Sequence, residues 1–273
     1  MQKIVDSNFL QSDELRAYLA ASPDNEAVIT DYAAMEAHKG NTLKSIYKSM
    51  EILCGFPRQV VILKSTIIVC GLRGRAADLR QPLIDQDQTE HFPTYCGQLQ
   101  AAKASNLALQ REILEHGRVA IAQMARVETD VALMPEVFAD MAEAFTPDEI
   151  SIIRRSLPYT EIMIDKVMRS VMMLATNFFK NHPNAGWLPT AEELPNTFIF
   201  RFSLCAYLLH LCWISQGSQA TIKPEKLRND LIDVNFAAFA TYFDGLLSAD
   251  KKLTRIYFQA ELILREILYW FMK

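Results

Sequence analysis

Short apolar runs alternate with helix-forming segments over the first 70 residues, and this alternation constrains the fold more than any other feature. The runs cover residues 3–5, 27–29 and 59–63, and the last is rich in β-branched side chains. Residues 66–70 are either a fourth strand or a continuation of the third. Strands separated by helices pair in parallel, with helices covering both faces of the sheet. We therefore expect an α/β fold with a short parallel sheet.

The strand pattern stops near residue 76, and helical periodicity replaces it up to about residue 196. Within this block, Thr146, Pro147 and Glu149 have the spacing of a capping box, which predicts the start of a helix. Methionines recur at helical spacing in the stretch 162–173, which is typical of core packing and also suits an adaptable partner groove. The protein is therefore expected to be dominated by helices overall.

The composition restricts the cellular compartment and the kinds of partner that we expect for this protein. The net charge of −4 argues against a protein that coats nucleic acid by bulk electrostatics, although a local basic patch remains compatible with it. The five cysteines are odd in number and lack CxxC spacing, so neither a disulfide framework nor a zinc site is indicated. We expect a reduced, cytoplasmic protein without a secretory signal.

The most apolar window, residues 198–214, is interrupted by Arg201 and His210. Its length favours a buried core helix over a membrane span. We expect a helix over residues 197–215, no membrane partner, and a last amphipathic helix over residues 253–271.

Acidic residues follow the predicted strands and begin the neighbouring helices. Asp6 and Asp250 each come after a short apolar run, and Glu36 and Asp233 lie in the early turns of helices. The carboxyl ends of parallel strands gather at one edge of a sheet, where ligands bind. Carboxylates brought together there repel one another unless a cation is bound. Ligation by oxygen alone indicates Mg²⁺ or Mn²⁺.

Two N-terminal segments resemble motifs of the PIN-like nuclease superfamily. Residues 4–10 are similar to its first motif, an apolar strand ending in Asp6 with a hydroxyl residue and Asn8 after it. Residues 30–36 are similar to its second motif, in which a helix presents Glu36 a few residues after a hydroxyl cap. Either segment alone would be a weak signal.

The C-terminal part carries the more specific resemblance. Residues 233–250 are similar to the third and fourth motifs together: Asp233, an Ala-rich helix, a short strand, Ser248 and Asp250, in matching order and spacing. Asp230 lies one helical turn before Asp233 and shares its face, so either is a candidate third ligand.

The resemblance implies a three-layer α/β sandwich that hydrolyses phosphodiester bonds, usually of RNA. Asp6, Glu36, Asp233 and Asp250 would hold a metal that polarises the scissile phosphate and activates a water molecule. Ser248 would position a carboxylate or water, and Asn8 would hold the loop around Asp6.

The chain departs from the family pattern in two ways. A helical block, residues 76–196, separates the second and third motifs, so we expect a catalytic core made of residues 1–75 and 197–273 with an inserted helical domain. The chain also shows no obvious final strand. The insertion is a candidate surface for a protein partner or for homo-oligomer formation.

An RNA substrate, single-stranded or structured, requires cations near the site. Arg73, Arg75, Lys251 and Lys252 are candidates for contacts with phosphates, although solvated surface charge explains them equally well. Two other functions stay open: a non-catalytic PIN-like interaction module that binds a protein partner through the helical insertion, and a DNA-directed nuclease of the same architecture. Neither a Walker-type phosphate loop nor a GxSxG elbow occurs in the sequence.

Overall fold

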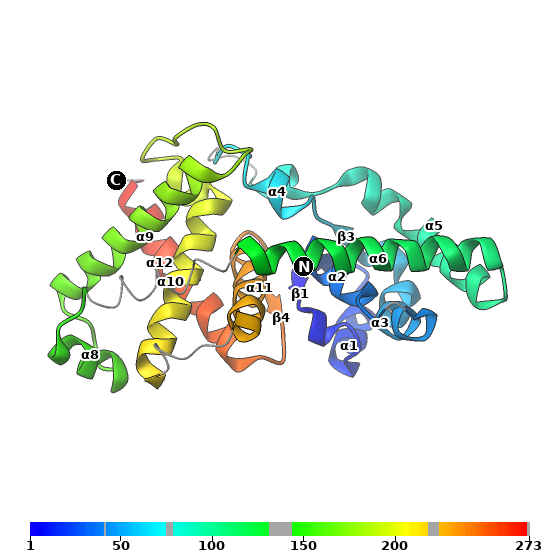
Figure 1. Ribbon diagram of the computed structural model, residues 1–273, viewed down its shortest axis with the longest axis horizontal. Helices are drawn as coiled ribbons and strands as arrows, with labels where there is room; N and C mark the ends of the chain where they lie inside the picture. Colours follow the sequence, from blue (N-terminus) through cyan, green and yellow to red (C-terminus); the bar gives the residue numbers. More distant parts are fainter. Residues whose placement is uncertain (41, 75–78, 131–143, 218–223, 272–273) are drawn as a thin grey trace. The chain divides into compact units, whose positions relative to one another are not determined.

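The computed structural model describes residues 1–40, 42–74, 79–130, 144–217 and 224–271 (Figure 1). The chain divides into two compact units. The first unit comprises residues 1–69, 78–126 and 242–254, and the second comprises residues 70–77, 127–241 and 255–273. These boundaries differ from the predicted limits of the insertion, which are residues 76 and 196. Whether the helical block is an insertion remains a prediction.

A parallel sheet forms the centre of the first unit. Its strands are β1 (Gln2–Val5), β2 (Glu26–Ile29), β3 (Val60–Ile62) and β4 (Leu246–Leu247), in the order β3-β2-β1-β4. Ile4 pairs with Val28 on one side and with Leu246 on the other. Successive side chains of a strand point to opposite faces. Because Ile4 and Val5 are both fully buried, the helices and loops cover both faces. The expected α/β class with a parallel sheet is confirmed.

Several helices of the first unit begin at a residue whose side chain caps the first turn. Ser12 accepts a hydrogen bond from the amide of Leu15, and Thr30 accepts one from the amide of Ala33. The helices are α1 (Asp13–Ala21), α2 (Asp31–His38), α3 (Leu43–Gly55), α4 (Thr66–Val69), α5 (Gln86–Lys103) and most of α6 (Leu107–Asp130). Short 3₁₀ turns are η1 (Ser7–Phe9), η2 (Pro57–Gln59) and η3 (Gln81–Leu83).

The segment expected as a fourth strand or as an extension of the third is the short helix α4. Its first residue explains the difference. The carboxylate of Asp31 accepts hydrogen bonds from the Thr66 amide at 2.7 Å and from the Thr66 hydroxyl at 2.8 Å. An acid at the start of a helix satisfies an otherwise unpaired amide. This tertiary contact outweighs the β-propensity of the Ile67–Val69 run.

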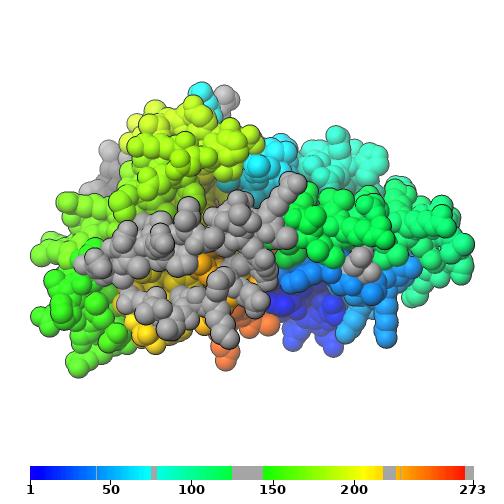
Figure 2. All heavy atoms as spheres, in the orientation of Figure 1, coloured from blue at the N-terminus to red at the C-terminus, as the bar shows by residue number. Residues whose placement is uncertain are grey.

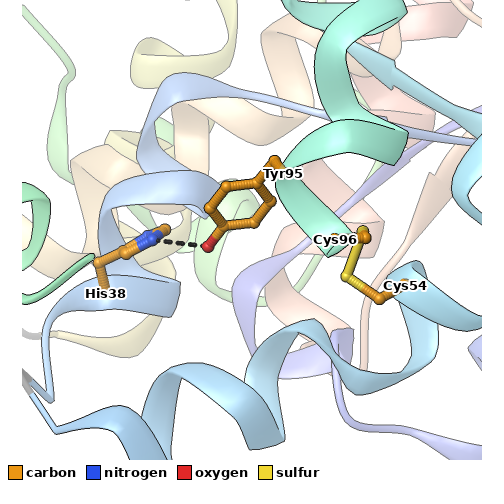
Figure 3. The surroundings of a disulfide bond; sticks show 4 residues. All are labelled: His38, Cys54, Tyr95 and Cys96. Carbon is orange, nitrogen blue, oxygen red and sulfur yellow. Dashed lines mark hydrogen bonds between the residues drawn. A yellow bond between two sulfur atoms is a disulfide. The ribbon is translucent and has the colours of Figure 1, made fainter. Parts of the chain in front are cut away.

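The expectation of an entirely reduced chain is wrong for one pair of cysteines. Cys54 on α3 and Cys96 on α5 form a disulfide with a Cα–Cα distance of 5.3 Å (Figure 3). Cys70, Cys205 and Cys212 are free thiols. The pairing was missed because the two partners lie 42 residues apart and meet only once α3 packs beside α5.

The second unit is helical in its described residues. Its helices are α8 (Pro147–Arg154), α9 (Glu161–Asn181), α10 (Phe198–Gln216), α11 (Pro224–Ala240) and most of α12 (Lys251–Phe271), with the short turn η4 (Leu194–Asn196). The predicted capping box at the start of α8 is confirmed, since Thr146 and Glu149 cap each other's backbone amides. The predicted helices over residues 197–215 and 253–271 correspond to α10 and α12.

Helix α10 is the buried centre of this unit. It packs against α8, α9 and α11. Its Arg201 is only 3% exposed, and the guanidinium donates to the carbonyl oxygens of Pro195 at 3.0 Å and Thr241 at 2.7 Å. Among the described helices, α10 alone is long and apolar enough to cross a membrane, and 89% of its most apolar window is buried inside the protein. The core helix of a globular protein can be equally long and apolar. The sequence led us to expect that residues 198–214 form such a buried helix.

Candidate metal site at the carboxyl end of the sheet

Asp6 lies directly after β1 and is fully buried. Its amide donates to the carbonyl of Leu247 at 3.0 Å, which extends the pairing of β1 with β4 up to the acid. The Ser248 hydroxyl donates to Asp6 Oδ2 at 2.7 Å. The Asn8 amide and the Ser7 hydroxyl approach Oδ1 at 3.4 Å each. Ser248 therefore supplies the shortest hydrogen bond to this carboxylate.

Asp250 is linked to Asp6 through the same serine. The Asp250 amide donates to Ser248 Oγ at 3.0 Å, so one hydroxyl connects the two segments. The Asp250 carboxylate also caps α12, because its Oδ1 accepts hydrogen bonds from the amides of Lys252 at 2.6 Å and Leu253 at 3.1 Å. Asp250, a predicted ligand, is thus the cap of a helix in the structure.

No Lys, Arg or His of the described residues forms an ion pair with Asp6. Removing a carboxylate from water is costly unless a cation or several hydrogen-bond donors compensate for the lost hydration. At Asp6 the donors are a hydroxyl at 2.7 Å and two longer contacts. The Asp6 carboxyl group is therefore fully buried without an ion-pair partner among the described residues.

Two further acids of the first unit lie on α2. Glu36 is half-buried, and its carboxylate accepts no hydrogen bond from the described residues. Asp31 holds Thr66 as described above, and burial raises the pKa of its carboxyl group, an effect that the hydrogen bonds from Thr66 partly offset. Asp31 is not one of the acids that the sequence predicted as ligands. Its place two residues after β2 was the signal that it belongs to the same edge as Asp6.

Asp230 and Asp233 lie on α11 in the second unit. Asp230 is 4% exposed, and its Oδ2 accepts a hydrogen bond from the indole N–H of Trp213 at 3.0 Å. This contact ties α11 to α10 and gives Asp230 a structural role. Asp233 is half-buried.

The structure brings together only part of the predicted ligand set. Asp6, Ser248 and Asp250 form one hydrogen-bonded group in the first unit. Among the described residues, no three His, Cys, Asp or Glu side chains are arranged to hold a metal ion. Glu36 therefore does not complete a three-ligand group with Asp6 and Asp250.

Of the four residues predicted to contact phosphates, the described ones lie in different parts of the structure. Lys251 is exposed and Lys252 half-buried at the start of α12, directly after Asp250. The guanidinium of Arg73 instead lies 5.4 Å from the ring centre of Trp187, and both residues belong to the second unit. Arg75 lies outside the described residues. Only the lysine pair adjoins the carboxyl end of the sheet.

The amino end of the same sheet holds an aspartate with a cation. Asp244 precedes β4 and accepts hydrogen bonds from the Gln2 amide and from Arg80 Nη2, each at 2.7 Å. Burial acts to raise the pKa of Asp244, but the bonds from Gln2 and Arg80 outweigh it and leave the pKa below its ordinary value.

A cavity of about 440 Å³ lies beside α2 and is lined by side chains of α2, α3, α5 and α6. Figure 2 shows α5 and α6 on the surface of this unit. At the cavity, His38 Nδ1 lies 2.8 Å from the Ala34 carbonyl oxygen and must donate to it. Because burial lowers the pKa of His38, the ring is neutral and its Nε2 accepts from the Tyr95 hydroxyl at 3.0 Å (Figure 3). Tyr95 precedes the disulfide cysteine Cys96.

Comparison with protein families, with curated proteins and with solved structures gives no match for this chain. The case for a function therefore rests on the chemistry of its own residues.

Proposed function

We propose that the chain is a metal-dependent nuclease with a PIN-like core, which hydrolyses RNA in the cytoplasm. The observation that carries the proposal is the Asp6 carboxylate, fully buried after the inner strand β1 and without a cationic partner among the described residues. A divalent cation supplies the counter-charge that this carboxylate lacks.

The residues present fit Mg²⁺ or Mn²⁺. Mg²⁺ commonly binds to one or two carboxylates, keeps several water molecules and takes up substrate phosphates. Asp6 and Asp250, joined by Ser248, supply such a pair. Glu36, which forms no three-ligand group with these two acids, would contribute through water, and Asp233 stays a prediction from the sequence.

When bound, the metal polarises the scissile phosphate and lowers the pKa of an attacking water. The residues of the chain orient the parts of the site. Ser248 fixes one oxygen of Asp6 by its 2.7 Å hydrogen bond, and the Asn8 amide holds the loop that follows. Lys251 and Lys252, which directly follow Asp250, would contact substrate phosphates.

The test combines metal binding with cleavage. Mn²⁺ should raise the melting temperature of the full chain, and the same preparation should cut RNA only with Mn²⁺ or Mg²⁺ present. Both effects should be lost in Asp6→Asn and Asp250→Asn. RNA and DNA of one sequence, offered in competition, separate an RNA-directed from a DNA-directed nuclease. Metal binding without cleavage of either substrate would contradict the enzymatic proposal.

An interaction module is the second candidate, because α9 exposes large apolar side chains. Ile162 is 68% exposed and Met173 is 51% exposed. Methionine-rich surfaces adapt to partners. This candidate predicts that Ile162→Ser with Met173→Ser abolishes binding of a protein partner, whereas Asp6→Asn leaves that binding unchanged.

A further inference from the structure

A second cavity, of about 340 Å³, lies entirely within the second unit. It is bounded by α8, the loop after it, α10 and α12. Its walls are mostly apolar, and the side chains concerned are Ile153, Leu157, Leu208, Leu211, Leu262 and Ile263. Leu157 is 47% exposed and Leu262 is 63% exposed, so apolar surface continues to the mouth. The volume is in the range of sites for small ligands.

Among the described residues that line this cavity is an arginine without an acidic partner in the described part of the chain. Arg255, on α12, is exposed and forms no ion pair within the described residues. The residues three and four positions away on the helix are Lys251, Lys252, Phe258 and Gln259, so no neighbouring turn offers a carboxylate. No Asp or Glu is among the described residues that line the cavity.

Another arginine on the same helix behaves differently. Arg265 pairs with Glu261 one turn earlier, at 3.0 Å. Arg265 therefore has a carboxylate partner within α12, whereas Arg255 has none among the described residues.

Uncharged hydrogen-bonding groups accompany Arg255. Tyr159 and Gln259 both line the cavity. Burial raises the pKa of the Tyr159 hydroxyl, and the positive charge of Arg255 acts against this shift, so the two groups lie within electrostatic reach of each other. A planar guanidinium with a nearby hydroxyl donor matches the two oxygens of a carboxylate.

We propose that this cavity binds a small apolar monocarboxylate. The hydrocarbon part lies against the leucine and isoleucine walls, and the carboxylate pairs with Arg255 and accepts from Tyr159. The charge of the lining selects the ligand, because the described lining residues include the cation Arg255 and no carboxylate. This site is independent of the proposed nuclease chemistry.

The test compares octanoate with octanamide, which has the same shape and no charge. Calorimetric titration of the full chain, at a pH where the acid is ionised, should show one octanoate bound at least tenfold more tightly than octanamide. Arg255→Met should remove that preference. Arg265→Met, which removes the same charge from the same helix, should keep it.

A variant that fills the cavity locates the ligand. Ser215 lines the cavity near the end of α10, and Ser215→Phe should abolish octanoate binding while the melting transition stays cooperative. Equal binding of octanoate and octanamide, unchanged binding by Arg255→Met, or absence of binding at millimolar octanoate would each overturn the proposal. Binding that survives in Ser215→Phe places the ligand elsewhere and overturns it as well.

Discussion

An aspartate lies at each end of the parallel sheet, and the two aspartates differ in burial and in hydrogen-bonding partners. At the amino end, Asp244 keeps a side chain that is 32% exposed and pairs with Arg80 at 2.7 Å. At the carboxyl end, Asp6 is fully buried and receives its shortest hydrogen bond from the neutral hydroxyl of Ser248. Among the described residues, the more deeply buried acid is thus the one without an ion pair. The cation that we propose would be needed at one end of the sheet and not at the other.

Removal of the disulfide should have the largest effect on stability. The bond lies in the first unit, which contains both ends of the sheet. Cys54→Ser should lower the free energy of unfolding by roughly 2–4 kcal/mol, since the bond closes a long loop in the unfolded chain. The measurement is urea unfolding with and without a dithiol reductant. Cys70→Ser, which removes a free thiol, is the matched control.

A thiol titration checks the premise of that experiment. The denatured chain should show three reactive thiols before reduction and five after it. Five reactive thiols before reduction would show that the disulfide is absent. Cys54→Ser would then not be expected to change the free energy of unfolding. Disulfides are rare in reducing compartments, so the same count in freshly lysed cells tests the proposed cytoplasmic setting.

Exchanging the acids tests the comparison directly. Asp6→Asn should reduce RNA cleavage by at least about 100-fold, or about 2.7 kcal/mol in the barrier, because the proposed metal loses a ligand. Asp244→Asn should retain cleavage, since its carboxylate serves Arg80 and Gln2. Equal losses in the two variants would show that both acids act through stability alone.

Ser248 is expected to have the next largest effect. Ser248→Ala removes the 2.7 Å hydrogen bond to Asp6 and should weaken Mn²⁺ binding about 10-fold or more, as for other residues that orient a ligand. The Mn²⁺ concentration at half of the full melting-temperature shift measures this. Ser7→Ala, which removes a contact of 3.4 Å, should change that midpoint little. A larger effect of Ser7 would reverse the assigned roles.

The amino end of the sheet should show the smallest effect, and one that depends on pH. Asp244 has a lowered pKa, so its pair with Arg80 stabilises the fold above the ordinary carboxyl pKa of 3.8, and this contribution is lost as the pH falls through the lower folded value. Arg80→Met should cost about 0.2–1 kcal/mol at neutral pH. Urea unfolding at neutral and acid pH should show that the difference in unfolding free energy between the unaltered chain and Arg80→Met becomes smaller below pH 3.8. A difference that is constant with pH would assign the loss to Arg80 packing on Phe243.

The parts of the fold that follow from local chemistry could be predicted from the sequence. The first three strands are short apolar runs, and Ser12, Thr30 and Thr146 each mark a helix start. These signals act within a few residues, so the sequence displays them directly.

The parts that depend on contacts between distant residues could not be predicted in the same way. Residues 66–69 have the composition of a strand, but the bonds from Thr66 to Asp31 make them a helix. Cys54 meets Cys96 only through the packing of α3 on α5. The resemblance to PIN-like motifs did place Ser248 near an acid, because order and spacing were available there. Glu36 and Asp233 as ligands remain predictions.

The pairing of β1 with β4 sets an order of events during protein synthesis. Asp6 leaves the ribosome early, and its partner Ser248 follows 242 positions later. Until then β1 has β2 on one side and an open edge on the other. The proposed cleavage site is therefore assembled only after residue 250 has been made. A nascent chain that has not yet reached residue 250 therefore lacks the hydrogen-bonded group of Asp6, Ser248 and Asp250.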